Sequence, residues 1–111
     1  MEALDKNIKA LLSVIRKTAE YREYKKQEEI LSRNPELLER VDHFRAENYQ
    51  LQSKASDNLF SVAEQLCRES EELRRYPEVN AFLDAELALC KLMQNICRQL
   101  VAGIDVHIPN L

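Results

Sequence analysis

Apolar residues recur at alternating steps of three and four positions along most of this chain, which is the spacing of one face of an α-helix. The first such stripe consists of Leu4, Ile8, Leu11, Ile15 and Ala19. After it the sequence becomes strongly polar through residues 20–29, EYREYKKQEE. We therefore predict a first helix over about residues 3–33, with a second half that lies mostly in solvent.

A second stripe continues through the middle of the chain. It contains Leu37, Val41, Phe44, Asn48, Leu51, Ala55, Asn58, Val62, Leu66, Glu69 and Leu73. This regularity is typical of coiled-coil packing and predicts one long helix over about residues 36–75. The segment SKASDN at 53–58 holds Ser and Asp, which cap helices, so a break at this point stays open. No Gly or Pro enforces a break, and we favour the single helix.

The third stripe is wider than the other two. It contains Val79, Leu83, Glu86, Cys90, Met93, Cys97, Leu100 and Ile104, with Phe82, Leu89 and Ile96 beside it. We predict a third helix over about residues 78–103, ended by Gly103, and a short tail over 104–111. Two other helices cannot cover so wide a face, so the chain is expected to self-associate as a dimer or tetramer. The expected interface residues are Phe82, Leu89, Met93, Ile96 and Leu100.

One phrase occurs twice in the chain. LSRNPELLERVDHFR begins at Leu31, and LRRYPEVNAFLDAEL begins 42 positions later, at Leu73. Proline is tolerated in the first turn of a helix and disfavours helix in the residue before it, so each phrase predicts the start of a helix. Asn34 is a good N-cap for the first start, whereas Tyr76 is a poor one for the second. We interpret the repeat as a helix corner used twice.

The alternative is that the repeat carries binding or catalytic groups. Glu36 and Asp42 recur as Glu78 and Asp84 at matching places. A repeated ligand-binding element would use these four carboxylates.

Composition agrees with a helical protein. A single Gly and three Pro among 111 residues leave little material for the turns that a sandwich or barrel needs. The predicted fold is all-α: one domain, residues 1–111, built as a three-helix antiparallel bundle with a long central helix.

Charge and hydropathy limit the partners. Sixteen Lys and Arg against nineteen Asp and Glu give a formal net charge of −3, with mixed signs, which argues against direct nucleic-acid binding. The first residues lack the basic and apolar pattern of a signal peptide, and no stretch approaches the ~20 apolar residues of a membrane span. We expect a cytoplasmic protein with no membrane contact.

The cysteines and histidines are the remaining candidates for chemistry. Cys90 and Cys97 lie about two helical turns, or ~10 Å, apart and fall on the third stripe, so we interpret them as packing residues. There is no CxxC motif. An iron–sulfur or metal-binding redox sensor that uses Cys67, Cys90 and Cys97 is the alternative.

No catalytic pattern supports an enzyme. His43 stands near Asp42 and Glu47, as charged helix surfaces often arrange by chance, and His107 in the tail has no better support. The sequence contains no glycine-rich phosphate loop, HExxH or GxSxG motif. We expect no catalytic residue and no cofactor.

Three segments resemble the YlbF/YmcA family of small bacterial helical proteins, and its YheA-like branch in particular. They are NPELLERVDHFR at 34–45, YPEVNAFLDAELAL at 76–89 and VAGIDVHIP at 101–109. The similar order and spacing extend over nearly the whole chain.

The resemblance implies an all-helical, self-associating cytoplasmic protein that acts as a regulatory partner without catalysis. Members of the YlbF and YmcA branches form a complex with YaaT that modulates RNase Y-dependent mRNA processing and influences competence, biofilm formation and sporulation. That complex is linked to iron–sulfur clusters. The cysteine-rich endings of those branches are replaced here by Gly103-Ile104-Asp105. Other regulatory proteins, including family paralogues, are the expected partners besides the chain itself.

Overall fold

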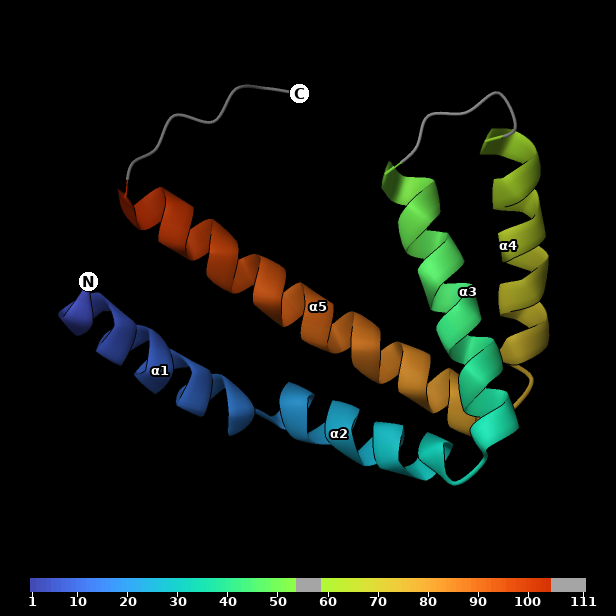
Figure 1. The fold of residues 1–111 in the computed structure, drawn as a ribbon, viewed down its shortest axis with the longest axis horizontal. Coiled ribbons are helices and arrows are strands. Elements are labelled where there is room, and N and C mark those ends of the chain that lie inside the picture. The colour runs from blue at the N-terminus through green and yellow to red at the C-terminus, as the bar shows by residue number, and fades with distance from the viewer. Residues whose placement is uncertain (54–58, 105–111) are drawn as a thin grey trace. The chain divides into compact units, whose positions relative to one another are not determined.

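A computed structural model describes residues 1–53 and 59–104, and over these residues the secondary structure is entirely helical. The helices are α1 (Glu2–Arg16), α2 (Ala19–Ser32), α3 (Pro35–Ser53), α4 (Leu59–Leu73) and α5 (Pro77–Ile104), as Figure 1 shows. The all-α class is therefore confirmed. The SKASDN segment beyond Ser53 and the predicted tail beyond Ile104, with His107, lie outside the described residues.

The predicted first helix is wrong as a single element, because it is interrupted at Lys17 and Thr18. Thr18 acts as the N-cap of α2: its hydroxyl oxygen accepts a hydrogen bond from the backbone N–H of Tyr21 at 3.3 Å. The same hydroxyl donates to the carbonyl of Ile15 at 2.6 Å. A threonine that bonds the backbone in this way offers it an alternative to continuous helix.

The predicted long second helix is also corrected. α3 ends at Ser53, α4 begins at Leu59, and the two helices pack against each other (Figure 1). A single straight helix could not fold back on itself in this way. The three-helix count therefore becomes five helices within the described residues.

Residues 25–83 form one of two compact parts of the chain. Its buried apolar side chains are Leu31, Leu37, Val41, Phe44, Leu66, Leu73, Val79, Phe82 and Leu83. Six of these residues form three pairs at equivalent positions of the two repeated phrases. The pairs are Leu31 with Leu73, Leu37 with Val79 and Val41 with Leu83. The repeat thus supplies the core of this part from two helix corners.

Both corners begin as the prolines predict. α3 starts at Pro35 and α5 starts at Pro77. Asn34 caps α3, with its Oδ1 accepting a hydrogen bond from the Leu37 N–H at 3.3 Å. At the second corner, the N–H groups of Val79 and Asn80 both donate to the backbone carbonyl of Tyr76, at 3.1 and 3.0 Å. The corner interpretation is confirmed for the positions of both helix starts.

The other compact part consists of residues 1–24 and 84–111. Its described residues comprise α1, the beginning of α2 and most of α5. Among its described apolar side chains, the buried ones are Ile15 and Ala85. The helices of this part therefore bury far fewer of their apolar side chains than the helices of residues 25–83 do.

Candidate interaction surface

From Leu89 onward, α5 carries four of the five predicted interface residues on accessible surface. Leu89 and Ile96 are half-buried, while Met93 is 38% exposed and Leu100 is 55% exposed. Ile104, one turn further on, is 72% exposed. These side chains form an apolar stripe along α5 that the chain's own residues cover only in part.

Phe82 is placed differently from the other four. Its side chain is only 1% exposed and belongs to the core of residues 25–83. The guanidinium carbon of Arg45 lies 5.2 Å from the centre of its ring, within the range of a cation–π contact. Phe82 is therefore engaged inside the chain.

The interpretation of Cys90 and Cys97 as packing residues does not hold within the single chain, where both are free and exposed, as is Cys67. Cys67 belongs to α4, whereas Cys90 and Cys97 belong to the open stretch of α5. Both residues lie on the stripe of α5 as predicted, but their side chains are exposed there. Among the described residues, no group of three or more His, Cys, Asp or Glu side chains is arranged to hold a metal ion.

The first helix has an open apolar face that the sequence prediction had placed inside a bundle. The exposed side chains of this face and its edges are Leu4 (53%), Ile8 (46%), Leu11 (37%), Leu12 (42%) and Val14 (61%). The three- and four-residue spacing indicated the face correctly. What the spacing could not show is that the described residues of the chain cover this face only in part.

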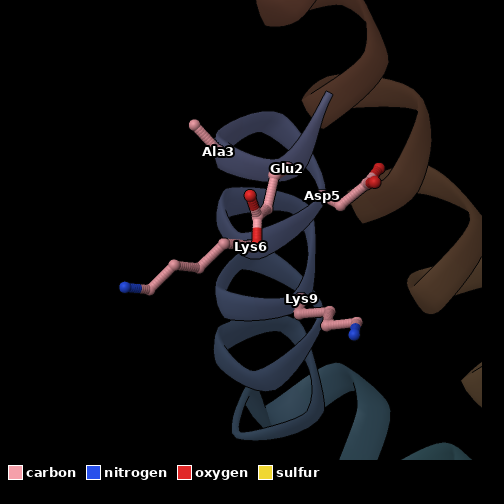
Figure 2. Close-up of a pocket in the computed structure, with 5 residues that line it drawn as sticks. All are labelled: Glu2, Ala3, Asp5, Lys6 and Lys9. Atoms are coloured by element: carbon pink, nitrogen blue, oxygen red, sulfur yellow. The ribbon is translucent and has the colours of Figure 1, made fainter.

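A hollow at the first turns of α1 is shown in Figure 2 and is lined by Glu2, Ala3, Asp5, Lys6 and Lys9. All five residues come from one helix. Asp5 and Lys9 project to one side of α1 and Lys6 projects to the other (Figure 2). The charged groups do not converge on a common point, as a ligand site would require.

The surface around His43 is similarly open. His43 and Arg40 line a hollow on α3 with Glu36 and Glu39. The Nε2 of His43 lies 2.8 Å from the Oε1 of Glu47, and the histidine side chain is 70% exposed. None of the residues that line this hollow is a nucleophile that could complete a catalytic arrangement with His43 and Glu47.

The repeated carboxylates lie at the surface. Glu36, Asp42 and Asp84 are exposed and Glu78 is half-buried. Asp42 forms an ion pair with Arg45 at 3.3 Å, one turn further along α3. Glu36 and Glu78 lie in the first turns of α3 and α5, where the helix dipole favours negative charge.

The helices in the described part of the chain do not combine the length and the apolar content that crossing a bilayer requires.

Comparison with known protein families gives a match over most of the chain. The protein-family model described as "Control of competence regulator ComK, YlbF/YmcA" matches residues 4–105. This range includes both helix corners, most of α1 and all of α5. No significant match was found among curated proteins or among solved structures.

Proposed function

The chain belongs to the YlbF/YmcA family, and on this premise we propose that it is a non-enzymatic regulatory adaptor of the bacterial cytoplasm that acts through protein–protein contacts. The observation that supports the proposal is the uncovered apolar stripe of α5, with Met93 and Leu100 at 38% and 55% exposure. An apolar stripe of this kind on a small helical protein is typical of a surface that another protein covers.

The first protein that we expect on this stripe is a second copy of the chain. Self-association through Leu89, Met93, Ile96 and Leu100 would give the stripe the cover that it lacks. The resulting oligomer would then meet other regulatory proteins, including paralogues of the same family. The charged surface of residues 25–83 is the part that remains available for them.

The process that we propose is the one to which the family is linked, the control of competence. The role that the resemblance implies for the YlbF and YmcA branches supports a more specific form of it. In that form the protein modulates RNase Y-dependent mRNA processing as a partner protein, with consequences for biofilm formation and sporulation.

Sedimentation at micromolar concentration tests the self-association. We expect a dimer or a larger species. Replacing Met93 and Leu100 together by Glu should shift the protein toward the monomer, because these side chains are exposed in the single chain and the change removes apolar contacts only in the assembly. Cys67→Ser is the matched control, an exposed position on another helix that should leave assembly unchanged.

The regulatory role is tested in the native cell. Deleting the gene should alter the processing of RNase Y-dependent transcripts, the wild-type chain should restore it, and the Met93→Glu/Leu100→Glu variant should not. Normal transcript processing in the deletion strain would contradict the role in mRNA processing while leaving the adaptor proposal to be judged by the sedimentation result.

A further inference from the structure

The open face of α1 contains a narrow apolar seam at its centre. Leu4, Ile8 and Leu11 follow one another at steps of four and three residues and are 53%, 46% and 37% exposed. Ile15 continues the seam and is 8% exposed. This is the spacing with which one helix packs along another at a shallow angle.

The seam has the same pattern in both directions along the helix. In an antiparallel pair of such helices, a seam residue of one helix faces the complementary seam position of the other. If Ile8 faces Leu11 of a second copy, then Leu11 faces Ile8 in return, while Ile15 stays buried within its own chain. A two-fold symmetric contact requires this kind of self-complementary pattern.

The charges of α1 also favour an antiparallel copy. Its first turn is acidic, with Glu2 and Asp5, and Arg16 lies in its last turn, followed by Lys17. Asp5 and Arg16 are eleven residues apart, which is about three full turns, so they lie on the same flank of the helix. An antiparallel copy places Asp5 of each chain near Arg16 of the other, whereas a parallel copy places like charges together.

The net charge of the surrounding part distinguishes a second copy from other occupants. Residues 1–24 and 84–111 contain seven Lys and Arg and seven Asp and Glu, so their formal net charge is zero. The whole net charge of −3 therefore resides in residues 25–83. A neutral surface meets a copy of itself without net repulsion. An anionic lipid surface or a strongly charged protein would instead require an excess of the opposite charge, which this part of the chain lacks.

We propose that α1 pairs with α1 of a second copy of the chain, antiparallel, with Ile8 against Leu11 at the centre and Asp5 beside Arg16 on both flanks. The proposal rests on the self-association proposed above and assigns it a second contact, separate from α5.

Engineered cysteines test the register. In a background with Cys67, Cys90 and Cys97 replaced by Ser, the Ile8→Cys and Leu11→Cys chains are mixed and oxidised at micromolar concentration. We expect a disulfide between the two different chains to form at least about tenfold faster than one between two Ser13→Cys chains, because Ser13 is exposed on the opposite side of α1. Cross-linking at equal rates would overturn the proposed pairing.

Charge reversal tests the direction. Asp5→Arg alone should weaken self-association about five- to twentyfold, because it replaces an attraction by a repulsion at two symmetric places. The double change Asp5→Arg/Arg16→Asp should restore the wild-type association, since it exchanges the partners within an antiparallel pair. A parallel pair would gain no such restoration, and a double variant as weak as the single one would overturn the antiparallel arrangement.

The two proposals fail in different ways. A wild-type protein that sediments as a monomer overturns both of them. An oligomer that dissociates on Met93→Glu/Leu100→Glu but shows neither the Ile8–Leu11 cross-link nor the charge rescue overturns the pairing of α1 alone. Circular dichroism of each variant checks that the helices remain folded, which is expected because Asp5, Ile8, Leu11, Ser13 and Arg16 are all exposed.

Discussion

Leu73 and Leu100 both occupy an apolar stripe position of an amphipathic helix, yet Leu73 is 0% exposed and Leu100 is 55% exposed. The difference extends to the parts that contain them. Around Leu73, two helix corners bring the ends of α2 and α4 and the starts of α3 and α5 into residues 25–83. Around Leu100, the described residues supply chiefly α1 and α5.

The number of helix faces that can pack around each side chain explains why Leu73 is buried and Leu100 is exposed. A helix must bury its apolar stripe against other elements, and several helix segments can surround a side chain where two cannot. Residues 25–83 therefore contain a core of their own, while the rest of the chain keeps its apolar faces accessible. One part stabilises the fold and the other is available for association.

The largest effect that tests this contrast is the truncation of a core leucine. Leu73→Ala should lower the free energy of unfolding by about 2–5 kcal/mol, because it removes a fully buried side chain and leaves a cavity. Leu100→Ala should cost less than ~0.5 kcal/mol in dilute protein, because its side chain already meets water. Urea unfolding at low concentration, where association is weakest, measures both.

Raising the protein concentration sharpens the same comparison. Association stabilises the folded chain by mass action, so the cost of Leu100→Ala should grow with concentration while that of Leu73→Ala should not. Equal losses for the two variants in dilute protein would show that the exposed stripe of α5 is in fact part of the chain's own core.

Much of the structure of residues 25–83 was predictable from sequence, because the residues that mark its helix starts act locally. Proline fixes the backbone at a helix start and Asn34 offers a capping oxygen, and both act within one turn of the helix. The periodic stripes likewise placed Val41 on the second apolar face and Val79 on the third, and both side chains are fully buried.

The errors concern features that local periodicity does not determine. Thr18 has an unremarkable place in the sequence, and only its hydrogen bonds to Tyr21 and Ile15 show that α2 begins there. The pairing of α3 with α4 depends on contacts between residues distant in sequence. Cys90 and Cys97 were assigned to the correct face, but periodicity identifies a face without showing what covers it, and the chain leaves both exposed.

A smaller effect is expected at the first helix corner. Asn34→Ala should cost about 1 kcal/mol, because the Leu37 N–H loses the capping oxygen that it meets at 3.3 Å. Asn34→Ser is the matched control, since serine also caps helices and should restore most of the loss. Thermal or urea unfolding gives the values, and an Asn34→Ala variant as stable as the wild type would show that the corner does not depend on its cap.

The two prolines should contribute slightly less. Pro35→Ala and Pro77→Ala should each cost about 0.4–1 kcal/mol, because alanine leaves the unfolded chain more freedom while both helix starts remain sterically possible. Association measured by sedimentation should stay unchanged in both variants, because both prolines lie in residues 25–83 and outside the proposed contact surfaces of α1 and α5. Loss of association with unchanged stability would instead favour the repeat as a binding element.

The smallest expected effect tests whether an ion pair contributes to the packing of α3 against α4. Arg40 on α3 and Glu72 on α4 approach to 3.8 Å, with side chains 46% and 66% exposed. An ion pair so accessible to water is screened and loses side-chain entropy, so a double-mutant cycle with alanine should give a coupling below ~0.5 kcal/mol. That small value should fall further in 1 M salt, where the screening length is about 3 Å. The packing of α3 on α4 would then depend on buried apolar side chains such as Val41 and Leu66. A coupling above ~1.5 kcal/mol would mean that a surface ion pair selects this helix pairing, and the contrast between the two parts could no longer be attributed to apolar burial alone.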